Sequence, residues 1–139
     1  MTIQLSLCSL DSLHDFDVIA REHWDSFNNK TPCFNKEILS NFNVIRASDS
    51  EDNTVGYLFY LCFQSLYYDE IWCQVDMFYI KPEYRKQGLG KKIFTKLEEE
   101  AKNTGASKIL SSFNMKQSLE GFYNKMNYQQ THIAVLKEI

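Results

Sequence analysis

The feature that most constrains the fold is a pair of long β-prone segments that are neighbours in the chain. Residues 55–66 and 71–80 are almost entirely apolar, aromatic or β-branched, a composition typical of strands in a sheet. Only the turn segment YYDE separates them. Two strands joined by so short a connection pair as an antiparallel hairpin. The near-continuous apolar run of residues 55–66 further predicts a strand buried on both faces.

Shorter segments before and after this hairpin predict further strands and helices. Apolar patterning predicts strands over residues 3–8, 44–47, 108–113 and 128–139. Helical spacing of apolar residues predicts a helix capped by Ser9 or Asp11, a weaker helix over residues 35–41, a long helix from Leu89 to residues 103–105, and a short helix over residues 119–126. This order of elements predicts a mixed α/β sheet covered by helices.

Length and composition fit a single domain over residues 1–139. The chain is 44% apolar and 24% charged, which is ordinary for a globular protein. Its net charge of -3 provides no overall attraction to nucleic acid or to an anionic membrane. No apolar run reaches the roughly 18 residues of a membrane span, and the chain start lacks the basic residues of a signal peptide. We therefore expect a cytoplasmic protein with neither nucleic acid nor a membrane as partner.

The four cysteines, Cys8, Cys33, Cys62 and Cys73, contain no C-x-x-C pair and lie in or beside apolar segments. Metal ligation and a disulfide framework are alternatives that the spacing leaves open. Reduced, mostly buried thiols fit the pattern best, because free cysteine is among the most buried residue types. We expect no metal site.

Two glycines precede the long helix in the segment RKQGLGKK. The first N–H groups of a helix have no partner within it, and the helix dipole adds positive potential there. Gly88 and Gly90 carry no Cβ, so an anion can approach the backbone closely. Basic residues stand on both sides: Arg85, Lys86, Lys91 and Lys92. The pattern favours a phosphate or pyrophosphate site, and its alternative is a plain strand-to-helix turn with solvated lysines.

The segment VDMFYIKPEYRKQGLGKKIFTKLEEEAK resembles the acetyl-CoA-binding motif of the GNAT (Gcn5-related) N-acetyltransferases. Arg85, Gly88 and Gly90 match the signature Q/R-x-x-G-x-G/A between a strand and a helix. Further on, EGFYNKMNYQQ resembles the second signature of the family, except that Asn127 stands where the family usually has Gly. Asn tolerates the left-handed helix cap expected there. The resemblance implies a GNAT-like, mostly antiparallel sheet flanked by helices (α+β).

The resemblance also implies which residues bind acetyl-CoA, the cosubstrate. Its pyrophosphate would bind backbone amides of residues 87–91, beside Arg85 and Lys86. These five residues are Gln87, Gly88, Leu89, Gly90 and Lys91. Its pantetheine arm would run along the strand end at Phe78, Tyr79 and Ile80, with main-chain hydrogen bonds at Phe78 and Ile80. The pantetheine-contacting Asn of the family falls at Lys116 here, and Asn114 is the nearby substitute.

Two residues are candidates for the proton transfers of acetyl transfer. Tyr123 matches the signature Tyr of the family, whose hydroxyl commonly protonates the leaving sulfur, although a Tyr beside Phe122 also suits a core position. Asp76 is a lone carboxylate in an apolar strand, where burial raises the pKa and favours a base. A hydrogen-bonded core Asp is the alternative. Residues 74, 76, 78 and 80 share one face if no bulge intervenes.

The acceptor is the least constrained part of this hypothesis. His23, Trp24 and Asp25 end the first helix, which borders the acceptor site in the GNAT family, although Trp24 also fits the apolar stripe of that helix. Acidic residues there and in the hairpin turn could attract a cationic amine: Glu22, Asp25, Asp69 and Glu70. Solvated helix ends and turns are the alternative explanation for them.

The sequence therefore leads to an N-acetyltransferase in which a primary amine, from a small molecule or a protein, attacks acetyl-CoA directly. A CoA-binding module without turnover, used for regulation or protein contact, is the alternative of a different class. Nucleic-acid binding through the basic loop is a third, weakened by the net charge of -3. A homodimer is compatible with each of these three functions.

Overall fold

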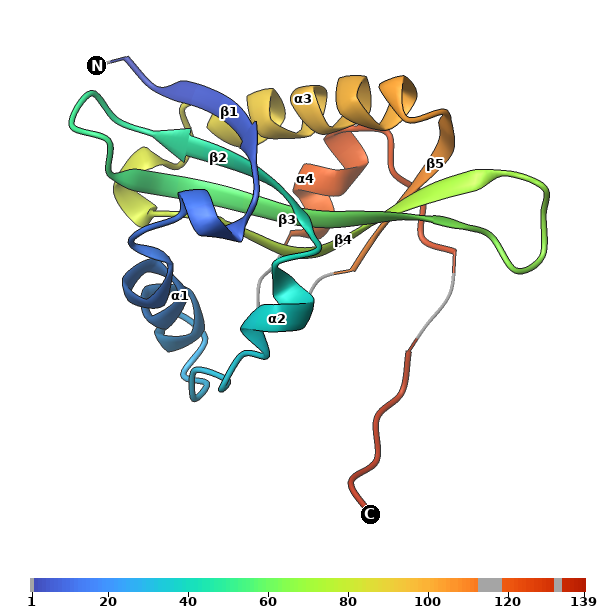
Figure 1. The fold of residues 1–139 in the computed structure, drawn as a ribbon, viewed down its shortest axis with the longest axis horizontal. Coiled ribbons are helices and arrows are strands. Elements are labelled where there is room, and N and C mark those ends of the chain that lie inside the picture. Colours follow the sequence, from blue (N-terminus) through green and yellow to red (C-terminus); the bar gives the residue numbers. More distant parts are fainter. Residues whose placement is uncertain (1, 113–118, 132–133) are drawn as a thin grey trace.

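The computed structural model describes residues 2–112, 119–131 and 134–139 and shows a five-stranded sheet with helices on both faces (Figure 1). The strands are β1 (Gln4–Cys8), β2 (Asn43–Ser48), β3 (Thr54–Gln64), β4 (Ile71–Ile80) and β5 (Ala106–Ser111), side by side in chain order. β1 to β4 pair antiparallel, whereas β4 and β5 run parallel. The predicted hairpin and the mixed, mostly antiparallel sheet are confirmed.

Helices bury apolar side chains against both faces of this sheet. They are α1 (Phe16–Asp25), α2 (Lys36–Leu39), α3 (Leu89–Asn103) and α4 (Glu120–Lys125), with short 3-10 turns at Leu10–Ser12 and Pro82–Tyr84. α3 and α4 cover one face, and α1 and α2 pack on the other (Figure 1). Within the described ranges, no helix combines the length and the apolar character that crossing a bilayer requires.

The helices do not cover β3 along its whole length. Residues 54–60 are all buried, as predicted for a strand with cover on both faces. From Leu61 onward every residue of β3 is exposed or half-buried, so the prediction is wrong for the second half of the strand. The reason is the short reach of α1 and α2, whose core includes Tyr57 and Phe59 but neither Leu61 nor Phe63. Figure 1 shows the hairpin extending past both helices.

The first helix begins later than predicted, and its expected caps are wrong. α1 begins at Phe16, and neither Ser9 nor Asp11 caps it. The carboxylate of Asp15, the residue before α1, accepts hydrogen bonds from the Thr54 backbone N–H at 2.9 Å and from the Thr54 hydroxyl at 2.7 Å. Tertiary contacts with the start of β3 therefore decide where α1 begins.

The C-terminal segment also departs from the prediction. After α4, Asn127 has a φ of 65°, the left-handed conformation expected at this position. The described residues 128–131 and 134–139 form no strand, so the predicted final strand is wrong for them. Val135 and Leu136 are 93% and 94% exposed. Without a neighbouring strand or a packed face, nothing in the described chain stabilises them as a strand.

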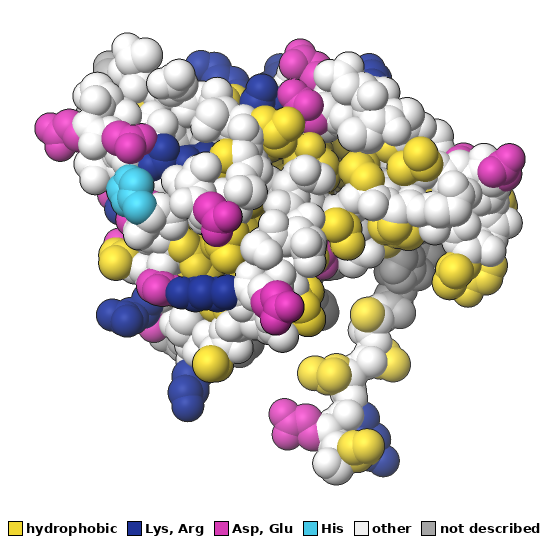
Figure 2. All heavy atoms as spheres, viewed as in Figure 1, with side chains coloured by type: hydrophobic (Ala, Val, Ile, Leu, Met, Phe, Trp, Pro, Cys, Tyr) yellow, Lys and Arg dark blue, Asp and Glu magenta, His cyan; other side chains and the backbone are white. Residues whose placement is uncertain are grey.

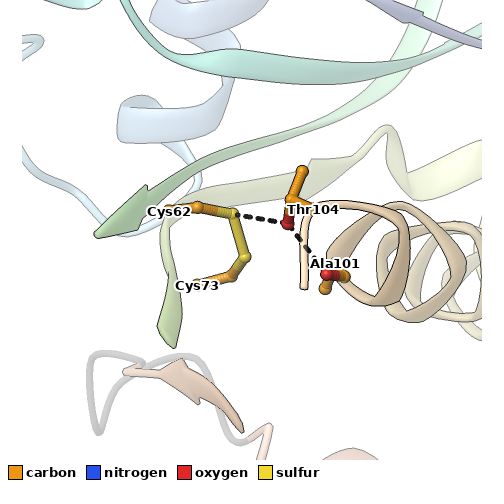
Figure 3. Close-up of a disulfide and its surroundings, with 4 residues drawn as sticks. All are labelled: Cys62, Cys73, Ala101 and Thr104. Carbon is orange, nitrogen blue, oxygen red and sulfur yellow. Dashed lines mark hydrogen bonds between the residues drawn. A yellow bond between two sulfur atoms is a disulfide. The ribbon is translucent and has the colours of Figure 1, made fainter. Parts of the chain in front are cut away.

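Cys62 and Cys73 form a disulfide (Figure 3), which corrects the expectation of reduced thiols. The two residues are direct partners in the antiparallel β3–β4 register, with Cα atoms 4.0 Å apart, so their side chains leave the same face of the sheet. Cys62 Sγ lies 3.7 Å from the hydroxyl of Thr104 at the end of α3. The remaining cysteines are free, with Cys8 half-buried and Cys33 exposed, so that the expected burial is wrong for Cys33.

We expect the double variant Cys62→Ala, Cys73→Ala to lose about 3 kcal/mol of unfolding free energy, because the unfolded chain regains the entropy of the closed loop. Urea unfolding under non-reducing conditions measures this loss. Cys33→Ala is the control and should unfold as the wild type does. Four reactive thiols in the denatured, unreduced protein would contradict the disulfide.

Candidate functional site

β4 contains one residue more than the part of β3 with which it pairs. Phe59 pairs with Met77, and the next residue of β3, Tyr60, pairs with Val75, which leaves Asp76 without a partner. Such a β-bulge bends a strand and increases its local twist. The unpaired residue is the exposed carboxylate that the sequence singled out as a candidate base.

The bulge transfers the side chains that follow it to the opposite face of the sheet. Val75, before it, packs in the core under α3. Met77, two residues later, packs in the core under α1 instead, and Phe78 and Ile80 pack on the α3 side. The expectation that residues 74, 76, 78 and 80 share one face depended on the absence of a bulge, so it is wrong. Gln74 points to the α1 face.

β4 and β5 part where the bulge begins. Their parallel ladder ends with the pair Val75 and Ser111, and β4 continues to Ile80 without a partner strand among the described residues on that side. Two strands that separate in this way leave main-chain groups of β4 available to another partner, except the carbonyl oxygen of Ile80, which accepts a hydrogen bond from Arg85.

The main chain of Phe78 and Ile80 points toward the space between the parted strands. Lys81 donates its N–H to the carbonyl oxygen of Val55 on β3 at 2.9 Å. Main-chain groups alternate in direction along a strand, so those of Phe78 and Ile80 point away from β3. This is the orientation that a pantetheine arm hydrogen-bonded to both residues would require.

Tyr123 of α4 lies beside the last pair of the β4–β5 ladder. Its hydroxyl is 2.7 Å from Ser111 Oγ, and its ring packs edge-on against Phe94 and Tyr128. The residue is only 6% exposed. Burial raises the pKa of Tyr123, and the hydrogen bond with Ser111 lowers it by less. The phenol is therefore protonated at neutral pH and is able to donate a proton.

The loop before α3 has the backbone conformation of a helix start that is open to an anion. Gly88 is the N-cap, with a φ of 82°, and Lys86 also has a positive φ of 61°. No side chain of the described residues caps the first turn of α3. A Cβ added at Gly88 would meet no atom within 4 Å, so the space over this turn is open.

Gly90 is required for a different reason than Gly88. A Cβ added there would lie 3.0 Å from Cε1 of Phe122, a tight contact that would require the Phe122 ring to shift. The missing side chain lets α3 approach α4. This packing brings the start of α3 close to the helix that carries Tyr123.

The side chains around the loop support its conformation. Arg85 donates from Nε to the carbonyl oxygen of Ile80 at 2.7 Å, and its guanidinium carbon lies 5.5 Å from the centre of the Tyr79 ring. Gln87 donates from its amide to the carbonyl oxygen of Glu83 at 3.1 Å. Arg85 and Gln87 thus connect the loop to the segment before it. The backbone N–H groups at the start of α3 are left as the groups that can bind an anion.

The structure does not bring every predicted residue to the region between the parted strands and the glycine loop. Tyr79 is buried under α1 at 4% exposed, and its main chain points toward β3. Leu89 is buried on the core side of α3, so only its backbone can face an anion. Lys86 and Lys91 are exposed beside the loop. Asn114 lies outside the described residues.

The Asp76 carboxylate accepts a hydrogen bond from the side-chain amide of Gln74 at 3.3 Å. Although the residue is exposed, partial desolvation of the carboxyl group by neighbouring atoms raises its pKa, and this hydrogen bond lowers the pKa by less. A carboxylate with a raised pKa is a stronger base than an ordinary one. Asp76 stands on the β4 segment where the strands part, so it can act on a group bound there directly or through water.

The acidic residues expected to draw in an amine are partly neutralised. Glu70 accepts hydrogen bonds from Lys108, Trp72 and Ser107, which lower its pKa to about 2. Glu22 lies 3.7 Å from Lys81. Among the residues that the structure describes, no group of three His, Cys, Asp or Glu side chains is placed to hold a metal ion.

His23 is a buried polar residue whose placement the sequence analysis missed. It is 5% exposed, its Nδ1 lies 2.6 Å from the Tyr57 hydroxyl, and its ring stacks on Tyr79 at 4.7 Å. The sequence does contain a pattern that indicates this burial, because His23 follows Phe16 and Ala20 at helical spacing on the buried side of α1. Burial, and secondarily the charge of Arg85, lowers the pKa of His23 to about 4.

Comparison with known families agrees with this geometry. A family model described as an acetyltransferase (GNAT) domain matches residues 40–130. A search of curated proteins finds no match. The matched range includes the β3–β4 hairpin, the glycine loop, α3 and α4.

Solved structures share the fold at low sequence identity. An aminoglycoside acetyltransferase from an uncultured soil metagenomic sample is 14% identical, with a TM-score of 0.80, over 100% of this chain and 99% of its own. A ribosomal-protein-alanine N-acetyltransferase from Brucella melitensis biovar Abortus is 15% identical, with a TM-score of 0.84, over 100% of both chains. A Trypanosoma brucei acetyltransferase is 14% identical, with a TM-score of 0.77, over 99% of this chain and 100% of its own.

Buried His23 should make the protein less stable as the pH falls. Unfolded chains bind a proton at this residue below about pH 6.5, whereas the folded state resists protonation until about pH 4. As the pH is lowered from about 6.5 to about 4, the unfolding free energy should therefore decrease by about 3 kcal/mol more in the wild type than in His23→Gln. Urea unfolding across this range measures the difference. His14→Gln, at an exposed position, should keep the wild-type slope, and equal slopes in wild type and His23→Gln would contradict the prediction.

Proposed function

The chain belongs to the GNAT acetyltransferase family, and we propose that it transfers the acetyl group of acetyl-CoA to a primary amine by direct attack while both are bound. The observation that carries the proposal is the parting of β4 and β5 beside an open glycine loop, with Asp76 and Tyr123 at the point of separation. Two structures of the same fold are named for amine acceptors, an aminoglycoside and a ribosomal-protein alanine.

The residues present fit the shape and charge of acetyl-CoA. The pyrophosphate would meet the uncapped N–H groups at the start of α3, where Gly88 leaves open space and the helix dipole favours negative charge. The pantetheine arm would hydrogen-bond to the main chain of Phe78 and to the backbone N–H of Ile80, in the place that a longer β5 would occupy. Lys86 and Lys91 are free to pair with phosphate oxygens at the rim.

The proposed reaction divides two proton transfers between Asp76 and Tyr123. Acetyl-CoA supplies the activated acetyl group. The neutral amine nitrogen forms a bond to the thioester carbonyl carbon, and the bond from that carbon to sulfur breaks. Asp76, directly or through water, takes the proton that the nitrogen loses, and the Tyr123 hydroxyl gives its proton to the departing sulfur. Ser111, at 2.7 Å, holds that hydroxyl in position.

We expect Tyr123→Phe to lower kcat about a hundredfold, because the leaving sulfur loses its proton donor. KM for acetyl-CoA should change little, since the phenol contributes to the reaction rather than to binding. Steady-state assays that follow CoA release measure both constants.

Tyr128→Phe is the matched control for this variant. The Tyr128 hydroxyl is buried and has no hydrogen-bond partner in the described part of the chain, so its removal should leave kcat unchanged. Equal kcat values for wild type and Tyr123→Phe would exclude the phenol as the acid.

We expect Gly88→Asp to weaken CoA binding at least about a hundredfold, because its carboxylate would stand where a phosphate must bind. Gly88→Asn is the matched control, since Asn has the same shape, carries no charge and tolerates the positive φ equally well. Calorimetry with CoA should show that the Asn variant binds far better than the Asp variant. Equal affinities of the two variants would contradict a phosphate site at this turn.

Binding of CoA without turnover of any amine would favour the CoA-binding module considered from the sequence. The buried, hydrogen-bonded Tyr123 and the unpaired Asp76 are the features that favour catalysis over that alternative. The cytoplasmic location, the absence of nucleic-acid and membrane partners, and the homodimer stay predictions from the sequence.

A further inference from the structure

An apolar strip of the sheet is left open beside the proposed reaction centre. Leu61 and Phe63 on β3, Trp72 on β4 and Leu110 on β5 form this strip on the α1 side of the sheet. Leu61 pairs with Gln74 and Phe63 with Trp72, whereas Leu110 lies next to Gln74 across the parallel ladder. All four side chains are exposed or half-buried, because α1 and α2 do not reach them. Figure 2 shows hydrophobic side chains at the surface over the β3–β4 hairpin, on the right of the view.

The strip is continuous with Asp76. Gln74 lies between them, and its amide contacts the Asp76 carboxylate at 3.3 Å. With about 3.3 Å per residue along a strand, the Leu61 and Gln74 pair lies roughly 7 Å from Asp76, and the Phe63 and Trp72 pair roughly 13 Å. A bound amine held at Asp76 would therefore have apolar surface under the rest of its molecule.

The charges along the strip favour an acceptor with a single positive charge. Asp76 forms no ion pair within the described ranges. At the far end, Lys108 lies 4.9 Å from the centre of the Tyr68 ring and 5.1 Å from that of Trp72, and Glu70 neutralises it at 2.6 Å. A second cation on the acceptor would lie on apolar side chains and close to the ammonium group of Lys108, which repels it.

From the proposed function we infer a substrate class: the acceptor is a small monoamine that carries an aromatic or branched alkyl group, and Leu61, Phe63 and Trp72 bind that group. The amine is placed by Asp76, and the strip provides discrimination against polyamines and aminoglycosides. The strip is short, because it ends at Lys108 and the stacked rings of Tyr68 and Trp72. A surface of this length favours a small molecule over a polypeptide.

The test compares kcat/KM for four amines: phenethylamine, ethylamine, putrescine and a tripeptide amide that begins with Phe. We expect phenethylamine to exceed ethylamine and putrescine by about tenfold to a hundredfold, which is the gain typical of binding one apolar group. Leu61→Thr should reduce the ratio of phenethylamine to ethylamine about tenfold. Leu7→Thr, which changes an exposed leucine of β1, should keep the wild-type ratio.

Each contrary result has a distinct meaning. Preference for putrescine, or a ratio unchanged in Leu61→Thr, would overturn the assignment of the strip while the acetyltransferase proposal stands. A higher kcat/KM for the tripeptide than for phenethylamine would replace the small amine by a polypeptide and overturn the assignment as well. CoA binding without acetylation of any amine would overturn the proposed function, and this inference with it.

Discussion

The unpaired residue Asp76 is the constraint on which the arrangement of the site depends. A strand of regular pleat would keep Val75, Met77 and Tyr79 on one face of the sheet. The bulge lets β4 contribute Val75 to the core under α3 and Met77 to the core under α1. It coincides with the end of the β4–β5 ladder, so one local irregularity exposes a carboxylate and frees the main chain beyond it.

Uneven helix cover explains where a substrate can reach this irregularity. α3 is long enough to pack along the sheet, and it buries Ile93, Phe94 and Leu97 completely. α1 and α2 are shorter and protect only the half of the opposite face that contains Tyr57 and Phe59. The α1 side of the sheet, where we propose that the acceptor binds, is therefore open toward the hairpin, whereas the side under α3 and α4 is packed with aromatic rings around Tyr123.

The sequence predicted those parts of the fold that depend on local patterning. The β-branched and aromatic runs gave the hairpin, helical spacing gave α3, and Asn127 adopts the left-handed conformation expected of it. The parts it could not predict depend on register. The bulge at Asp76 and the disulfide between Cys62 and Cys73 both depend on which residues of β3 and β4 face each other. The pattern of one strand alone does not determine that register. Helical spacing places His23 on the buried side of α1, but the tertiary contacts with Tyr57 and Tyr79 that hold its ring there could not be predicted from that pattern.

The two glycines of the loop show how one short sequence pattern combines two physical requirements. Gly88 has a left-handed φ of 82° and open space around it, which are conditions on the backbone and on the approach of an anion. Gly90 packs closely against α4, because a Cβ at this position would lie 3.0 Å from the Phe122 ring and would require that ring to shift. The first glycine thus shapes the turn, and the second sets the distance between α3 and the helix of Tyr123. The same short pattern therefore shapes the turn proposed to bind phosphate and sets the packing of α3 on α4, the helix that carries the proposed acid Tyr123.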